Sequence, residues 1–250
     1  MRIRVLSDLH LEHHDAPEGL PPTRQPAGGP NADGSGTDGP TEEPKNPEAD
    51  VVVLAGDIGR AVQSLRWARR TFPEVPVLLV TGNHEAYDHH LEATIAALRR
   101  ASDELPPASR PLDGTGTYFL HRDAVRIGDV RFLGCTFWTR FRLFEGRRAE
   151  AMRACRGQME DYQRIHLLRA RRLLRPRDTD RFHRGAARFL RREAGRQDTP
   201  ARATVVITHH APSPASVEPR YEEDLTSAAF VARRDDLIRA AGPDAWIHGH

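Results

Sequence analysis

The sequence predicts an α/β fold, and two observations support that prediction. Short apolar runs typical of buried strands alternate in the first half with segments whose apolar residues recur at helical spacing. In the second half, Gly128-Asp129 separates two alternating runs and predicts a hairpin, so an antiparallel element joins the parallel ones. Five apolar runs end in clusters of Asp, Asn or His; they span residues 3–6, 51–55, 77–80, 205–207 and 245–247.

The first of these runs, 3–6, leads directly into a pair of metal-capable side chains. Asp8 and His10 are two residues apart, which places both on the same side of an extended segment and lets them reach one ion. His13 and His14 come next, and we expect them in a solvated loop. The sequence therefore predicts that Asp8 and His10 act together.

Residues 16–49 differ in composition from everything around them. Pro, Gly, Asp, Glu, Ser and Thr dominate, and almost no side chain could anchor the segment to a core. This composition predicts a flexible insertion. Because it follows the first strand, beside the expected site, the sequence also leaves open that it acts as a lid.

The second and third runs form the most informative part of the chain. The run 51–55 stops at Gly56-Asp57, so a buried strand presents the Asp57 carboxylate to a loop. Helical spacing over 61–72, closed by prolines, and the run 76–80 complete a βαβ unit, which delivers Asn83 and His84. Loops at the carboxyl ends of parallel strands converge on one crevice, so these side chains should meet Asp8 there.

In the second half of the chain, apolar runs again end in histidines, and the predicted helices between the runs are longer. The run 203–207 returns to the sheet and delivers His209 and His210, and the run 245–247 delivers His250. Strand alternation would send neighbouring side chains to opposite sides, so only one of His209 and His210 should face the crevice. Helices are predicted over 90–101, 147–175, 179–194 (with Asp178 or Thr179 as its cap) and 226–241.

Composition limits the classes of protein to which the chain can belong. A chain of 250 residues with 38% hydrophobic residues fits one soluble globular domain. No apolar stretch approaches the roughly 20 residues that span a bilayer, and the N-terminus lacks a signal-peptide pattern, so we expect a cytoplasmic protein without a membrane partner. Cys135 and Cys155 are too few for a disulfide framework or a thiolate zinc site.

Charge is unevenly distributed along the chain. Residues 140–196 contain 18 Arg against 7 Asp and Glu, a net +11, although the formal charge of the whole chain is only +2. Such a segment could attract polyanions, nucleic acid among them, or could form a solvated helical face. We favour the solvated face, and binding that weakens steeply with salt would argue for the other interpretation.

The order of the clusters is more specific than any one of them. Asp8-Leu9-His10, Gly56-Asp57, Gly82-Asn83-His84-Glu85, His209-His210 and Gly249-His250 each close an apolar strand, and in this order the sequence resembles the calcineurin-like metallophosphoesterases. The resemblance covers residues 1–250 and implies a single domain. It also implies a four-layer α/β/β/α sandwich of two mixed sheets flanked by helices.

The resemblance implies a centre of two divalent metal ions. Asp8, His10 and Asp57 would hold the first ion, and Asp57, Asn83, His209 and His250 the second. His84 matches the catalytic histidine of the family, which is not a ligand and would protonate the leaving oxygen. Ligands of nitrogen and oxygen without thiolate suit Mn²⁺, our first expectation, and equally Fe or Zn.

The reaction implied is hydrolysis of a phosphodiester or phosphomonoester by a hydroxide that bridges the two ions. A small nucleotide-like substrate is expected. One departure from the family pattern concerns its last motif, Gly-His-x-His, because the sequence ends at Gly249-His250. We therefore expect a chain truncated at its C-terminus, and an alternative function as a catalytically impaired scaffold for other proteins stays open.

Overall fold

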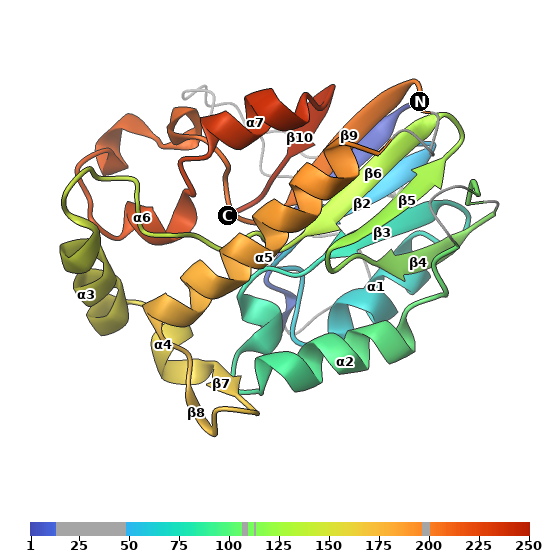
Figure 1. Ribbon diagram of the computed structural model, residues 1–250. Coiled ribbons are helices and arrows are strands. Elements are labelled where there is room, and N and C mark those ends of the chain that lie inside the picture. Colours follow the sequence, from blue (N-terminus) through green and yellow to red (C-terminus); the bar gives the residue numbers. More distant parts are fainter. Residues whose placement is uncertain (14–48, 107–109, 113, 197–200) are drawn as a thin grey trace, which may run out of the picture.

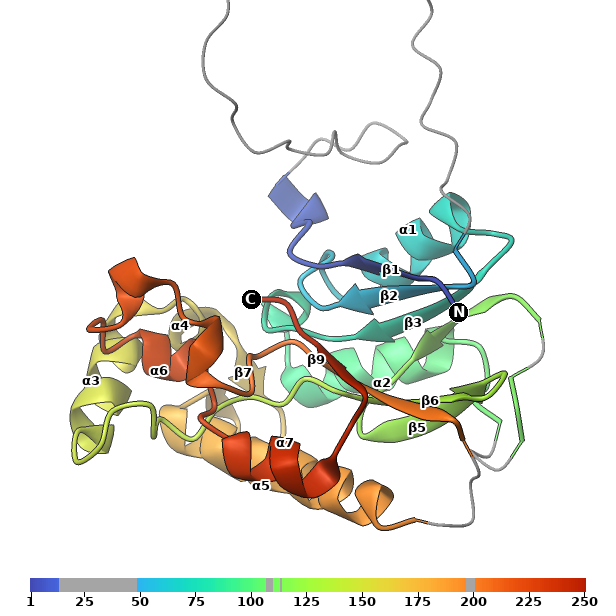
Figure 2. The same cartoon turned by 90° about the horizontal axis from the view of Figure 1, so that it is seen from above.

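The computed structural model describes residues 1–13, 49–106, 110–112, 114–196 and 201–250. In these residues two four-stranded sheets pack face to face, with helices on their outer faces (Figures 1 and 2). The predicted α/β/β/α layering is confirmed. The predicted insertion at 16–49 and His14 lie outside the described residues, apart from Ala49.

The first sheet is parallel throughout, in the order β1-β2-β3-β4. The second has the order β10-β9-β6-β5, and only its edge strand β5 runs antiparallel. Two mixed sheets are expected, but among the described strands only the second sheet combines parallel and antiparallel pairs. The strands are β1 (Ile3–Leu6), β2 (Val51–Ala55), β3 (Pro76–Val80), β4 (Gly116–Phe119), β5 (Asp123–Ile127), β6 (Val130–Cys135), β9 (Ala203–Thr208) and β10 (Ala245–Ile247).

Strand β2 shows why its sequence is an unbroken apolar run. Val51 and Val53 face the core between the two sheets, whereas Val52 and Leu54 face the helices outside. Successive side chains of a strand point to opposite faces, so a strand covered on both faces must be apolar at every position. This burial holds the end of β2, and with it Asp57, in a fixed place.

Helices cover the outer face of each sheet. Packing against the first sheet involves α1 (Gln63–Thr71) and α2 (Leu91–Ala101), and packing against the second involves α5 (Pro176–Ala194) and α7 (Asp235–Ala241). Further elements gather at one end of the sandwich (Figure 1); they are α3 (Arg148–Gln158), α4 (Asp161–Arg164), the hairpin of β7 (His166–Leu167) with β8 (Arg172–Leu173), and α6 (Ser227–Phe230). None of the described helices is long and apolar enough to cross a membrane.

The predicted helix over 147–175 is wrong, because tertiary pairing overrides its local preference. The chain leaves α3 at an extended Met159, and after α4 His166 forms a bridge to His90 beside α2. Its N–H donates to the carbonyl of His89 at 2.9 Å. This pairing with a distant loop requires extended backbone, so the segment forms α3, α4 and a hairpin.

Two smaller predictions also need correction, and one strand is not predicted. Helix α5 begins at Pro176, and Asp178 accepts the N–H of Arg175 at 2.9 Å from inside the first turn, so neither Asp178 nor Thr179 is the cap. The helix expected over 226–241 breaks into α6 and α7, because Val231 bridges to Ala211. Strand β4 has no counterpart among the predicted elements.

Candidate metal centre

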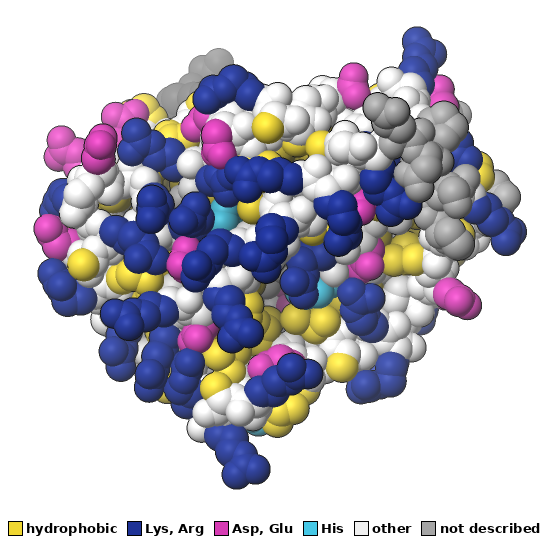
Figure 3. All heavy atoms as spheres, viewed as in Figure 1, with side chains coloured by type: hydrophobic (Ala, Val, Ile, Leu, Met, Phe, Trp, Pro, Cys, Tyr) yellow, Lys and Arg dark blue, Asp and Glu magenta, His cyan; other side chains and the backbone are white. Residues whose placement is uncertain are grey.

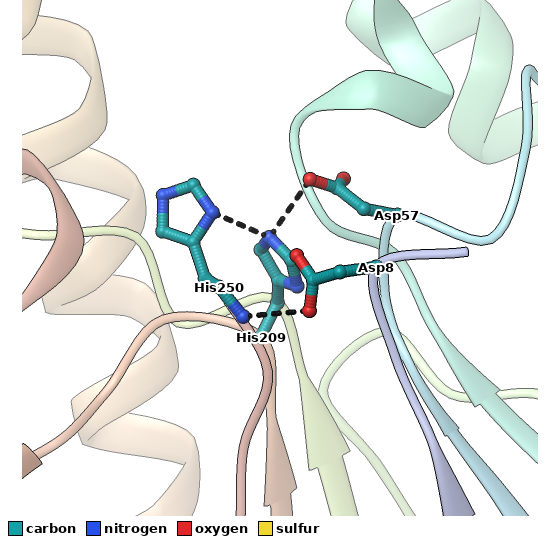
Figure 4. A group of neighbouring side chains, drawn as sticks. All are labelled: Asp8, Asp57, His209 and His250. Carbon is teal, nitrogen blue, oxygen red and sulfur yellow. Dashed lines mark hydrogen bonds and ion pairs between the residues drawn. The ribbon is translucent and has the colours of Figure 1, made fainter. Parts of the chain in front are cut away.

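Five strand ends bring the predicted residues to one edge of the sandwich. Asp8 follows β1, Asp57 follows β2 and Asn83 follows β3, all parallel neighbours in the first sheet. His209 follows β9 and His250 follows β10, which are parallel neighbours in the second. Figure 4 shows Asp8, Asp57, His209 and His250 pointing toward one another across the two sheets.

Asp57 lies at the centre of this arrangement. Its side chain is buried, with one carboxylate oxygen 3.2 Å from Nε2 of His209 and the other accepting the N–H of His84 at 2.8 Å. Burial would raise the pKa of Asp57, but the positive charge of His209 outweighs it and lowers that pKa. The carboxylate is therefore held in its charged form.

Two groups of ligand-capable atoms share Asp57. Asp8, Asp57, His209 and His250 each offer an atom within 4.8 Å of the others, and so do His10, Asp57 and His84. This grouping differs in two respects from the expected ligand sets. Asp8 lies with the two histidines of the second sheet, and His84, expected not to be a ligand, lies with His10.

The backbone around these groups is strained. Asp8, His10 and Asp57 have φ angles of 54°, 49° and 54°, in the left-handed region that residues other than glycine rarely adopt. Such strain persists where surrounding structure over-determines it, and it is frequent at functional sites. Here it turns the three side chains inward at the ends of their strands.

His209 rather than His210 faces the cluster. Nδ1 of His209 donates to the carbonyl of Ala55 at 2.8 Å, which leaves Nε2 directed at Asp57 and 3.0 Å from Nδ1 of His250. Burial lowers the pKa of His209, but Asp57 more than offsets this and raises it to about 9. His210 instead donates to the carbonyl of Thr136, and burial together with His209 lowers its pKa to about 3.

These residues fit divalent cations on structural grounds. Nε2 of His209 and Nδ1 of His250 lie 3.0 Å apart, and Nε2 of His209 is 3.2 Å from an oxygen of Asp57, so two ring nitrogens and a carboxylate converge on one point (Figure 4). Gly82 keeps space open, because a Cβ there would lie 2.6 Å from Nε2 of His209 and would collide with Asp57. Carboxylate oxygens with imidazole nitrogens suit Mn, Fe or Zn.

Asn83 is oriented by residues outside the predicted site. Its amide nitrogen donates to Asp161 at 2.8 Å, and the hydroxyl of Tyr87 donates to the same carboxylate oxygen at 2.7 Å. Asp161 is buried, on α4. With the nitrogen held in this way, the amide oxygen of Asn83 faces the cluster, 3.2 Å from Nε2 of His209.

His84 is held between Glu12 and Tyr87. One oxygen of Glu12 lies 2.9 Å from Nδ1 of His84 and 3.4 Å from Nδ1 of His10. Burial would raise the pKa of Glu12, but its bonds to the two histidines hold that pKa well below its usual range. The ring of Tyr87 stacks on His84, with centroids 4.1 Å apart. These two contacts fix the orientation of the His84 ring, and its Nδ1 atom is the one bonded to Glu12.

Glu85 joins the loops that carry Asp57 and Asn83. Its carboxylate accepts the N–H groups of Asp57 at 3.2 Å, Ile58 at 3.0 Å and Gly82 at 2.8 Å. The side chain is completely buried, and burial with the nearby Asp57 raises its pKa to about 7. It fixes the relative position of the ends of β2 and β3.

Sequence reasoning misses the supporting role of Glu12, Tyr87, Glu85 and Asp161. Glu85 stands inside a quoted motif, and its burial next to a glycine turn could have been expected. Asp161 gives almost no signal, because it lies in the segment for which a single long helix is wrongly predicted. Its only distinguishing feature is to be one of 7 acidic residues in the arginine-rich stretch.

Comparison with known proteins agrees with this geometry. The family model of calcineurin-like phosphoesterases matches residues 1–250. The chain belongs to the calcineurin-like phosphoesterase family. No curated protein sequence matches this phosphoesterase. Among solved structures it is similar to the phosphopantetheinyl hydrolase PptH of Mycobacterium tuberculosis, with a TM-score of 0.57 and 16% identity over 100% of this chain and 82% of that one. At that identity the likeness supports the fold alone.

Proposed function

We propose that this phosphoesterase hydrolyses a small phosphoester with two divalent metal ions held by Asp8, His10, Asp57, Asn83, His209 and His250, Mn²⁺ being the first candidate. The observation that carries the proposal is the position of Asp57. It is buried, charged, and shared by both groups of ligand-capable atoms. The bound ions would supply Lewis acidity toward the phosphoryl oxygens and an activated nucleophile.

The side chains around the ions have separable tasks. Because Nδ1 of His84 lies on Glu12, its Nε2 is the nitrogen that can give a proton to the leaving oxygen. Nδ1 of His209 is occupied by the carbonyl of Ala55, so Nε2 serves as its ligand atom. Asp161 acts through Asn83 by holding the amide nitrogen away from the ions.

A cavity beside the centre supports a substrate of small-molecule size. Its volume is about 440 Å³, and it is lined by His250, Phe230, Tyr221 and Val217 among others. Volumes in this range are typical of sites for small ligands. The similar solved structure is that of a phosphopantetheinyl hydrolase, which agrees with hydrolysis as the reaction. A nucleotide-like diester and a monoester both remain candidate substrates.

The proposal is tested by hydrolysis of bis(p-nitrophenyl) phosphate and p-nitrophenyl phosphate with added Mn²⁺, before and after chelation. We expect metal-dependent turnover of at least one ester. Asp57→Asn should lower it by about 10³-fold or more, because metal ions contribute several kcal/mol to stabilising such transition states. Asp129→Asn, in the exposed hairpin turn, makes the same chemical change away from the site and should leave the rate unchanged.

Two outcomes would count against the proposal. Turnover that survives both chelation and Asp57→Asn would place the chemistry elsewhere. A folded, metal-loaded protein that is inert toward both esters would favour the alternative function, a scaffold that binds other proteins.

A further inference from the structure

Arginines from three separate segments converge on one cavity outside the metal centre. The cavity has a volume of about 630 Å³ and lies between the loop 140–148, the end of α5 and the residues before and within α7. Figure 3 shows basic side chains gathered over this face, where α3, α5 and α7 lie in Figure 1. The arginines that line it are Arg140, Arg142, Arg148, Arg191, Arg233 and Arg234.

Several of these guanidinium groups are fixed before any ligand arrives. Arg234 is buried, donates to Asp236 at 2.7 and 2.8 Å, and lies 3.0 Å from Nε2 of His183. Arg140 and Arg148 both lie 3.2 Å from Asp180. Side chains held in place in this way lose little freedom on binding, which favours affinity.

The positive charge of the cavity is only partly neutralised. In the wall, six arginines stand against Glu145 and Asp236, an excess of four positive charges. Asp180 behind the wall pairs with Arg184 as well as with Arg140 and Arg148, so this additional pair leaves the excess unchanged. Arg142 forms no ion pair with a described residue, and Arg233 donates to the backbone carbonyl of Leu143.

Two residues at the cavity have positive φ angles, as three residues of the metal centre do. Phe141 and Arg233 have φ angles of 55° and 49°, in the left-handed region. Each lies next to a lining arginine in sequence, and strain of this kind is frequent at ligand-binding sites. Phe141, between two lining arginines, and Arg233, itself a lining arginine, turn the chain so that the arginines of separate segments face one space.

We propose that this cavity binds a small molecule bearing two phosphate groups. Two phosphates carry about three to four negative charges near neutral pH, which matches the excess of four positive charges. Guanidinium groups bind phosphate oxygens in pairs, with geometric specificity. The volume lies within the range of small-ligand sites, which favours a small molecule over a nucleic acid. The site is independent of the metal centre and of the reaction proposed there.

Calorimetric titration with inorganic pyrophosphate tests the proposal. The protein is treated with EDTA, so that pyrophosphate cannot bind through metal ions, and we expect saturable binding at one site. The double variant Arg142→Gln/Arg233→Gln should bind about tenfold more weakly or worse, because a hydrogen bond to a charged group contributes about 1.5–3 kcal/mol. Both side chains are exposed, so the variant should fold normally.

A matched control is Arg66→Gln/Arg100→Gln, which removes the same charge from exposed positions on α1 and α2 and should bind as the wild type does. Equal weakening in both double variants would show an effect of net charge only and would overturn the proposal. The absence of saturable pyrophosphate binding would overturn it too, as would binding of a single-stranded oligonucleotide but not of pyrophosphate.

Discussion

The strand ends and the helical region 140–194 contribute to the molecule in different ways. The strand ends supply every predicted metal ligand, and their side chains meet because parallel strands finish at one edge. The helical region supplies Asp161, which orients Asn83, and most of the arginines of the second cavity. The predicted ligands thus come from the strand ends, and the helical region contributes Asp161, one of the residues that support them. Substitutions in the two regions should therefore differ in how they affect activity, metal affinity and thermal stability.

The largest effect expected inside the centre, after that of Asp57, is that of His84→Gln. We expect kcat to fall by about 10²–10⁴-fold, the range for loss of a general acid, while the metal content per chain stays unchanged. Rates on the two nitrophenyl esters and metal analysis by mass spectrometry measure the two quantities separately. Metal lost together with activity would instead make His84 a ligand, as its position beside His10 and Asp57 allows.

Asp161→Asn tests the contribution of the helical region to the metal centre, because Asp161 lies on α4 and holds the predicted ligand Asn83. Both donors share one oxygen of Asp161, and an amide in its place would exchange two charge-assisted hydrogen bonds for weaker neutral ones, so the Asn83 amide would be held less firmly. We expect metal affinity to fall by about 10–100-fold, the usual effect of losing a residue that orients a ligand.

Titration of the metal-free protein with Mn²⁺ measures this affinity, and Tyr87→Phe, which removes only the neighbouring hydroxyl, should have the smaller effect. If Asp161→Asn lowered thermal stability but left metal affinity untouched, its role would be structural only.

Prediction from sequence is accurate for the strand ends and poor for the helical region. Strands buried on both faces, such as β2, are recognisable as continuous apolar runs, so the residues that follow them can be assigned to one edge of the sheet from sequence alone. The helical region is predicted poorly, because its shape depends on partners far away in sequence. His166 pairs with His90, and Val231 with Ala211, and neither pairing leaves a periodic pattern. The role of Asp161 is hidden for the same reason.

The smallest expected effect concerns acid stability of the helical region. His183 on α5 is completely buried, and Nδ1 lies 3.0 Å from the carbonyls of Phe137 and Trp138. Burial, with the nearby charges of Arg234 and Arg140, lowers its pKa to about 4. The stability that neutral His183 contributes is therefore complete above about pH 6.5 and is lost as pH falls toward 4.

Between pH 7 and pH 5 this loss corresponds to about 2 kcal/mol of unfolding free energy. His183→Gln cannot be protonated, so its midpoint of thermal unfolding should fall less on acidification than that of the wild type, by about 4–8 °C. Circular dichroism of the metal-free proteins at the two pH values measures the difference. Equal falls in both proteins would show that His183 does not control acid stability.

The proposal that Asp57 holds two metal ions is tested most directly by anomalous X-ray scattering from crystals soaked in Mn²⁺. We expect two peaks among the strand-end residues, both in contact with the Asp57 carboxylate, and no peak there in crystals of Asp57→Asn. Peaks that avoid Asp57, or an unchanged pair of peaks in the variant, would contradict it.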